Sequence, residues 1–240
     1  MNVACIPVLI ENAVSDDLAL SSTCGKTLLR HTFEAVCRAR TFDQIVIATN
    51  NERVVKLTES WACKTYVSSN PLLAQFQLAG EAISHVADNA ECIVILSVRE
   101  PDMPSTYLDR IVRSVNAGIG AVAISGPFDN MTQGHMNPND GQQIKVVASK
   151  QGKALYFTRR KTSGAAKLMG CFGFDRSTMR RIEMMPQSSM ALSEKVEPLS
   201  WLDNGLQVKV IQMEYSTLSI RDKEELSFWE PPTDQSHVGI

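Results

Sequence analysis

The chain has 240 residues, of which 44% are hydrophobic and 21% charged, with a formal net charge of −2. A chain of this length can bury a sizeable core, and we expect one α/β domain over residues 1–230 followed by a flexible tail at 231–240. The small negative charge gives no general attraction for nucleic acid or for an anionic membrane, so neither is expected as a partner.

Apolar runs alternate with amphipathic segments along the chain, which predicts strands joined by crossover helices and hence a mainly parallel sheet. The carboxyl ends of parallel strands are where ligands collect in such sheets. In chain order, we expect strands at 2–10, 45–49, 65–67, 93–97, 120–125, 143–148, 154–158, 170–174 and 207–213, and helices at 26–40, 51–61, 72–87, 104–115, 177–184, 188–202 and from about 221.

The strand at 93–97 is the centre of this pattern. Its residues are apolar and mostly β-branched without polar alternation, which is typical of a strand buried on both faces of a parallel sheet. Ser97, Arg99 and Glu100 lie at its carboxyl end, so they are the first candidates for a binding site.

The pattern changes after Gly126. Residues 127–141 are rich in Gly, Pro, Asn and Asp, and a predicted hairpin with a turn at 149–152 follows. We expect residues 137–174 to project from the sheet as a small β-rich arm. Because a lone hairpin is only marginally stable in water, the arm is expected to pack on a second copy, which predicts a homodimer.

The cysteines and histidines indicate a compartment and exclude one kind of site. Six cysteines lie far apart without any CxxC pair, and no signal peptide or long apolar run is visible, which favours reduced thiols in the cytoplasm. The four histidines share no metal-ligand spacing, so a zinc site is not expected.

Several short segments, taken in order, resemble one family. The sugar-acid cytidylyltransferases, and most closely the CMP-Kdo synthetases that couple CTP to 3-deoxy-manno-octulosonate, carry similar segments in the same order. The resemblance implies a Rossmann-like nucleotidyltransferase fold of the GT-A-like type, with a mixed, mainly parallel sheet flanked by helices and a small dimerisation arm. The matching segments are Ile6-Pro7, Gly25-Lys26, residues 45–49, Glu100-Pro101, Asn137-Pro138-Asn139, residues 144–147, residues 154–159, residues 170–174 and Glu224-Glu225-Leu226.

The loop after the first strand departs from that family. There the resemblance implies arginines and a lysine that contact the nucleotide triphosphate. Each missing cation removes a charge-assisted contact, and each added carboxylate repels a phosphate. In this chain the corresponding positions are Leu9, Val14 and Leu18, with Glu11, Asp16 and Asp17 added, and the base-reading stretch of the family is replaced by residues 72–78.

The metal positions depart more sharply. The two aspartates that hold magnesium in the family correspond to Arg99 and Arg221. Magnesium requires oxygen ligands, so no metal cofactor is expected unless Glu100 or Asp222 takes over. Two alternatives remain: the arginines pair with Glu100, Asp102 or Asp222, or they form an anion site where the metal would have been.

The sugar-acid side is better preserved. The resemblance gives Arg159 and Glu197 a role toward an acidic sugar, although Pro198 and Ser200 replace the glutamine and arginine of the family helix. Lys145 fits either a site residue or a surface lysine, and Asn50 lies where the family has aspartate. The candidate ligand-binding residues are therefore Arg99, Glu100, Arg159, Glu197, Arg221, Lys145 and Asn50, with no intact catalytic set and no metal site.

Two functions follow from these residues. The favoured one is a homologue that has lost or altered cytidylyl transfer and binds a small anionic ligand, such as an acidic sugar or a phosphate. The alternative is a divergent active nucleotidyltransferase that couples a nucleotide to an acidic sugar, with Arg99 and Arg221 supplying the charge of the metal.

Overall fold

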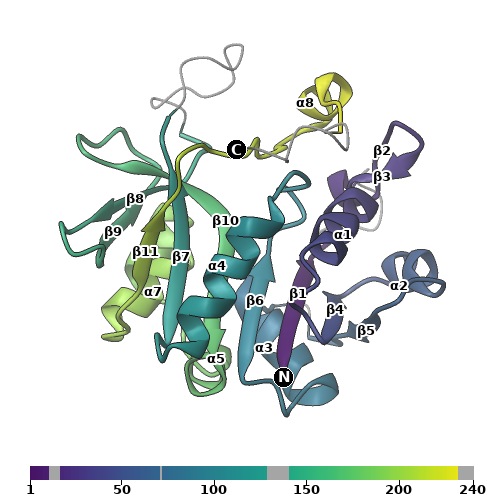
Figure 1. Cartoon of the computed structure of the whole chain (residues 1–240), viewed down its shortest axis with the longest axis horizontal. Helices are drawn as coiled ribbons and strands as arrows, with labels where there is room; N and C mark the ends of the chain where they lie inside the picture. The colour runs from purple at the N-terminus through teal and green to yellow at the C-terminus, as the bar shows by residue number, and fades with distance from the viewer. Residues whose placement is uncertain (11–16, 71, 129–140, 232–240) are drawn as a thin grey trace.

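A nine-stranded mixed sheet forms the centre of the protein, as seen in a computed structural model that describes residues 1–10, 17–70, 72–128 and 141–231 (Figure 1). The main order is β11 (Lys209–Gln212), β7 (Ala121–Gly126), β10 (Ala166–Asp175), β6 (Cys92–Leu96), β1 (Asn2–Val8), β4 (Gln44–Thr49) and β5 (Lys64–Val67). The parallel pairs are β1 with β4 and β6, β4 with β5, and β7 with β11, whereas β10 runs antiparallel to both β6 and β7.

Helices cover both faces of this sheet (Figure 1). One face carries α1 and α4, and the other carries α3 and α5, each through an apolar stripe. The bounds are α1 (Leu28–Arg38), α2 (Glu52–Thr58), α3 (Gln75–Val86), α4 (Ser105–Asn116), α5 (Arg176–Glu183), α6 (Ser189–Glu194), α7 (Pro198–Asp203) and α8 (Lys223–Phe228). The prediction of a mixed, mainly parallel sheet between helices is confirmed.

The central strand β6 is buried on both faces, as expected from its composition. Ile93 and Ile95 pack into the core on the α3 side, and Val94 and Leu96 pack into the core on the α4 side. Only one of its two neighbours is parallel, however, because the antiparallel strand β10 lies on the other side.

The predicted β-rich arm needs correction. Residues 170–174 belong to β10, which lies inside the main sheet between β7 and β6, so this part does not project. Only β8 (Lys145–Ala148) and β9 (Ala154–Thr158) lie off the main path, with β8 paired to the start of β10. Phe157 of β9 is already buried within its own chain, so it needs no second copy to cover it. The homodimer therefore stays a prediction.

The helix predicted at 188–202 is in fact two short helices, α6 and α7. Lys195 adopts a left-handed conformation (φ 53°, ψ 47°) between them, and Pro198 begins α7. Proline fits the first turn of a helix but lacks the N–H that a helix interior needs, which explains the break.

The helix predicted from residue 26 begins later, at Leu28. Thr27 caps it by accepting a hydrogen bond from the N–H of Arg30 at 3.2 Å. Before it, β2 (Ser22–Thr23) and β3 (Lys26–Thr27) form a small hairpin. Asn137-Pro138-Asn139, one of the segments that resemble the family, lies outside the described part of the chain, as does the tail from residue 232.

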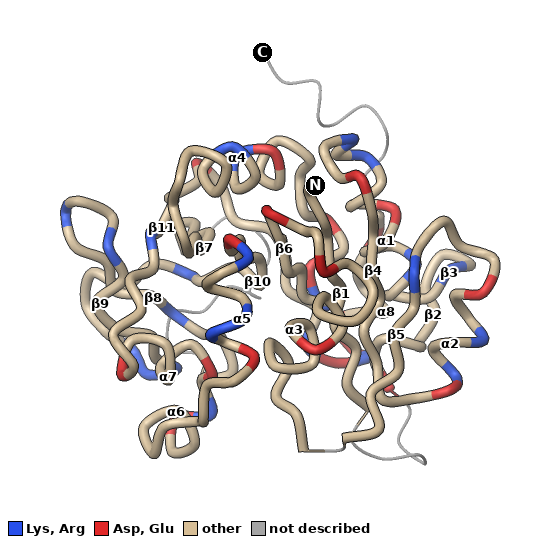
Figure 2. The backbone as a smooth tube through the Cα atoms, turned by 90° about the horizontal axis from the view of Figure 1, so that it is seen from below, with Lys and Arg blue, Asp and Glu red and all other residues tan. Residues whose placement is uncertain are grey.

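Charge and membrane features are ordinary. Basic and acidic residues are interspersed along the trace rather than separated into two halves (Figure 2). Within the described ranges, no helix is long and apolar enough to cross a membrane. All six cysteines are outside any disulfide.

Candidate functional site

A cavity of about 650 Å³ opens at the carboxyl ends of β1 and β6. Pro7 to Leu9 line it from the end of β1, and Ile95 and Ser97 line it from β6. This is the position that a parallel sheet favours for a ligand. Of the seven predicted site residues, the cavity brings together Arg99, Glu100, Arg159, Glu197 and Arg221, whereas Lys145 and Asn50 are not in its lining.

Glu100 is buried and engaged by donors of the protein itself. Its Oε1 accepts hydrogen bonds from the N–H of Gly170 at 3.1 Å and from the hydroxyl of Ser219, and its Oε2 accepts from the hydroxyl of Thr217 at 2.6 Å. The carboxylate therefore ties β10 to the chain segment that precedes α8. It is a structural group in the wall of the cavity.

A buried lysine that sequence reasoning missed lies next to this network. The ammonium of Lys167, on β10, donates a hydrogen bond to the carbonyl of Thr217. Burial lowers the pKa of Lys167, and the negative charges of Glu100 and Glu225 oppose that shift. Glu100 thus has a cation of its own chain nearby.

Arg221 is paired with an acid that the sequence analysis did not name. Its Nε donates to Oε1 of Glu225 at 2.8 Å and its Nη2 donates to the same oxygen, while its backbone N–H donates to Oε2 at 2.8 Å. Both side chains are largely buried. Of the two alternatives, pairing with an acid applies to Arg221, and Glu225, which the sequence analysis did not propose, is an acid that it pairs with.

Arg99 lies near a second arginine instead. Burial lowers the pKa of Arg159, and the positive charge of Arg99 lowers it further, so the two guanidinium groups, which both belong to the cavity lining, repel one another. Arg99 is exposed, and among the described residues its side chain has no hydrogen-bond or ion-pair partner. Its backbone carbonyl accepts from the N–H of Ile220 at 2.8 Å, which fixes the start of its side chain.

The guanidinium of Arg159 holds two loops together. Its Nη1 donates to the carbonyl of Gln142 at 2.5 Å, and its Nε and Nη2 donate to the carbonyl of Lys195 at 3.3 and 3.1 Å. Arg159 therefore contributes a positive charge to the cavity while its position is fixed by main-chain acceptors.

Glu197 faces the amino end of α3. Its two carboxylate oxygens accept from the N–H of Phe76 at 3.2 and 3.4 Å. Burial raises the pKa of Glu197 to about 7, although the backbone N–H groups of residues 75–77 act in the opposite direction. Burial thus favours the neutral form of this acid, and its carboxyl group is directed to the backbone of α3.

The two remaining candidates have structural roles. Lys145 is buried, which rules out the surface lysine, and its ammonium donates to the carbonyls of Gln143 at 3.0 Å and Arg159 at 2.8 Å. Burial and the charge of Arg159 lower its pKa. Asn50 exchanges two hydrogen bonds with the backbone of Ile10, at 2.9 and 3.1 Å, and so fixes the chain just after β1.

The loop after β1 presents apolar and acidic groups to the cavity. Leu9, Asp17 and Leu18 are in the lining, and Asp17 caps the short 3-10 helix η1 (Leu18–Leu20) by accepting from the N–H of Ala19 at 2.8 Å. Glu11, Val14 and Asp16 lie outside the described residues.

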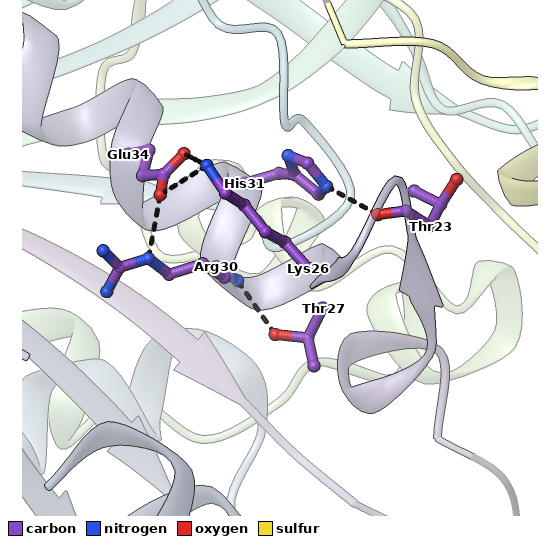
Figure 3. A network of polar contacts seen from close by, with 6 residues as sticks. All are labelled: Thr23, Lys26, Thr27, Arg30, His31 and Glu34. Atoms are coloured by element: carbon purple, nitrogen blue, oxygen red, sulfur yellow. Dashed lines mark hydrogen bonds and ion pairs between the residues drawn. The ribbon is translucent and has the colours of Figure 1, made fainter. Parts of the chain in front are cut away.

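Lys26, which follows the loop after β1, forms an ion pair with Glu34 of α1. The ammonium of Lys26 lies 2.8 and 3.0 Å from the two carboxylate oxygens of Glu34, and Nε of Arg30 donates to the same carboxylate at 2.9 Å (Figure 3). His31 contacts the carbonyl of Thr23 at 3.1 Å and so holds the hairpin against α1. Lys26 is thereby engaged with an acid of α1.

The side chains of the cavity do not fit magnesium. In the part of the chain that the structure describes, no three His, Cys, Asp or Glu side chains lie close enough together to hold a metal ion. Asp222, one possible substitute, caps α8 by accepting from the N–H of Glu225 at 2.8 Å. Glu100, the other, is occupied by hydroxyl and backbone donors, so the oxygen ligands that magnesium needs are not offered here.

Comparisons with known proteins agree with this architecture. A sequence model of the family described as cytidylyltransferase matches residues 19–207. The 3-deoxy-manno-octulosonate cytidylyltransferase of Chlamydia felis is 27% identical over 216 residues, covering 87% of this chain and 84% of the relative. The 3-deoxy-manno-octulosonate cytidylyltransferase of Chloroherpeton thalassium is 23% identical over 236 residues, covering 92% of this chain and 93% of the relative.

Solved structures show the same fold. A CMP:2-keto-3-deoxy-manno-octonic acid synthetase complexed with CTP superposes with a TM-score of 0.81 at 16% identity, covering 94% of this chain and 95% of that one. A 4-diphosphocytidyl-2C-methyl-D-erythritol synthase superposes with a TM-score of 0.64 at 13% identity, covering 94% of each chain. The chain therefore belongs to the cytidylyltransferase family and, within it, to the CMP-Kdo synthetase family.

Proposed function

We propose that this family member binds a small anionic ligand, a sugar acid or a phosphate ester, in the cavity and does not carry out magnesium-dependent cytidylyl transfer. The observation that carries the proposal is the pair of like charges formed by Arg99 and Arg159 in one cavity wall. An anion between two guanidinium groups removes their repulsion and accepts charge-assisted hydrogen bonds from the side chain of Arg99.

The neighbouring acids leave this charge available. Glu100 is saturated by Gly170, Thr217 and Ser219, and Glu197 lies on the amino end of α3. A volume of about 650 Å³ lies within the range of roughly 300–1,000 Å³ that is usual for small-molecule sites. The relatives are named for an acidic sugar, which is the ligand class that best matches these cations.

The alternative is a divergent active nucleotidyltransferase. Its support is the close superposition on a synthetase complexed with CTP. Against it are Leu9 and Leu18 at positions where the family places cations, and the engagement of Lys26 by Glu34. A triphosphate would meet few positive charges at that end of the cavity.

The test is a titration of the protein with Kdo and with inorganic phosphate by calorimetry, at low ionic strength and without magnesium. We expect saturable binding that is weakened about 10-fold or more in Arg99→Ala, because a charged hydrogen bond contributes roughly 1.5–3 kcal/mol. Arg53→Ala is the matched control. Arg53 is exposed on α2, so this substitution also removes one positive charge, but at a position away from the cavity. Equal affinities in the wild type and both variants would contradict the proposal.

Two further attributes belong to the proposal. We place the protein in the cytoplasm, supported by six cysteines without a disulfide. We also propose a homodimer through β9, supported by Leu155, whose side chain is 56% exposed. Light scattering at micromolar concentration tests the second, and Leu155→Asp is expected to shift a dimer toward monomer.

A further inference from the structure

Lys195 has a backbone conformation that glycine usually supplies. It follows the last residue of α6 with φ 53° and ψ 47°, and its N–H donates to the carbonyl of Ala191. A residue with a Cβ pays about 1 kcal/mol for this conformation relative to glycine. Among the described residues, Cys24, Arg40 and Lys195 are the non-glycine residues with positive φ, and only Lys195 lines the cavity.

The left-handed conformation has a role that does not require a lysine. It presents the carbonyl of residue 195 to the guanidinium of Arg159, which donates to it through Nε and Nη2. Glycine would present the same carbonyl at a lower conformational cost. The side chain of Lys195 must therefore be explained by something other than the backbone.

That side chain adds a third positive charge to the same wall. Lys195 is exposed and lines the cavity, and within the described ranges its ammonium group has no hydrogen-bond or ion-pair partner. The preceding acid, Glu194, pairs with Arg160 at 3.6 Å instead. Arg159 donates hydrogen bonds to the backbone carbonyl of Lys195 and is repelled by Arg99, and all three basic residues line the same cavity.

The charges of the wall can be balanced residue by residue. Glu225 offsets Arg221, and Asp17 caps η1. The other two acids of the lining are engaged elsewhere, Glu100 by Gly170, Thr217 and Ser219, and Glu197 by the amino end of α3. Arg99, Arg159 and Lys195 remain, and one carboxylate cannot neutralise three cations that come from the ends of β6, β9 and α6.

We propose that the ligand carries two separate anionic groups, with Lys195 binding the second while Arg99 and Arg159 bind the first. This inference rests on the proposed function and deepens it by naming the ligand class, a phosphorylated or otherwise doubly acidic sugar acid. The cost of a lysine in a left-handed conformation is then offset by a contact with the ligand.

The experiment compares 6-phosphogluconate with gluconate, which share a carboxylate and differ by one phosphate. Calorimetric titrations are made at low ionic strength on the wild type, Lys195→Gly and Arg40→Gly. Arg40 is the matched control because it too is a basic residue with positive φ (51°) after a helix, and it is absent from the cavity lining. Both variants lose one positive charge and relieve the same kind of backbone strain.

In the wild type, 6-phosphogluconate is expected to bind about 10-fold more tightly than gluconate. Lys195→Gly is expected to reduce that advantage to less than about 3-fold and to leave gluconate binding unchanged within about 2-fold. Arg40→Gly should retain the full advantage. Both variants should melt at or above the wild-type temperature, which shows that any lost affinity is not a folding defect.

Three outcomes would overturn the inference. If the wild type binds both probes equally, or if Lys195→Gly keeps the advantage of 6-phosphogluconate, Lys195 does not bind a second anion. In either of these two cases the proposed function still stands if gluconate binding depends on Arg99. If neither probe, Kdo nor phosphate binds, both fail together.

Discussion

The carboxylate of Glu197 accepts hydrogen bonds from the N–H of Phe76, a residue 121 positions earlier at the amino end of α3, at 3.2 and 3.4 Å. Pro198 follows directly and begins α7, so this contact fastens the connection between α6 and α7 to the helix beside the cavity. The backbone of Lys195, two residues earlier, is held by Arg159 in the same region. One acid thus sets the position of a cavity wall.

Glu197 should make the stability of the protein depend on pH. Its pKa is about 7 in the folded chain and ordinarily near 4.5, because burial disfavours the charged form. Between these values the folded state holds a proton that the unfolded state has lost, so stability should fall as the pH rises from about 4.5 to 7.

Glu197→Gln should remove this dependence while an amide oxygen still accepts from α3. We expect the variant to gain urea resistance relative to the wild type as the pH is raised from 5 to 8. Glu59→Gln, at an exposed position after α2, is the control, and its stability in urea should change with pH as that of the wild type does. Parallel profiles for all three proteins would show that Glu197 does not titrate in this range.

Glu100→Gln should destabilise the fold. The change weakens the hydrogen bonds that the side chain of residue 100 accepts from Thr217, Ser219 and Gly170. It also removes a negative charge that stabilises the buried ammonium group of Lys167. Breaking a buried charged network typically costs about 3–5 kcal/mol, and we expect a loss of about 3 kcal/mol in urea unfolding.

A double-mutant cycle with Lys167→Met separates the pair from its surroundings. The two changes should be non-additive, since the second removes the cation that the first leaves uncompensated. Strictly additive losses would mean that Lys167 and Glu100 do not interact.

Gly173→Ala should disturb the seam between β10 and α4. A Cβ at this position would clash with Cγ2 of Ile111 and lie 3.0 Å from Cγ2 of Val115, both on a packed helix. Overpacking of this kind costs about 1–3 kcal/mol, measurable as a lower urea midpoint. Gly141→Ala, where nothing lies within 4 Å of the added atom, is the control and should be close to neutral. A Gly173→Ala protein as stable as the control would show that the seam has room to adjust.

Local sequence patterns predicted most elements because the hydrophobic periodicity of a strand or helix is present in its own residues. The turn at 149–152 was also predicted correctly, since it depends on nearby residues. The pairing of β10 with β6 and β7 was missed, because it joins segments about 50 to 80 residues apart and no local pattern records a partner strand. That pairing is why residues 170–174 lie in the sheet and not in an arm.

The site shows the same division. The sequence placed Arg99, Glu100, Arg159, Glu197 and Arg221 in one region, and the cavity brings them together. It did not give the partner of Arg221, although the four-residue spacing to Glu225 at the start of a helix was a usable signal. Lys195 was hidden inside a predicted helix, and Pro198 was the sign that this helix had to break.

Turnover with CTP, Kdo and magnesium should be undetectable. The relatives' enzyme name implies pyrophosphate release, and an ordinary enzyme would achieve it on the order of 1–1,000 times per second. Here Leu9 and Leu18 face the cavity, Lys26 is held by Glu34, and Arg99 and Arg221 offer no oxygen to a metal. Each lost electrostatic contact with a transition state costs roughly 3 kcal/mol, so the combined loss should bring the rate below detection.

The double variant Arg99→Asp with Arg221→Asp separates the metal site from the phosphate contacts. Two aspartates facing one cavity provide the carboxylate oxygens that magnesium prefers, so calorimetry should detect magnesium binding in the variant and none in the wild type. Pyrophosphate release should stay absent in both, because the apolar residues Leu9 and Leu18 remain where a triphosphate needs cations. Magnesium-dependent release by the wild-type protein would instead establish the divergent transferase, and release by the double variant alone would show that the metal was the only missing part.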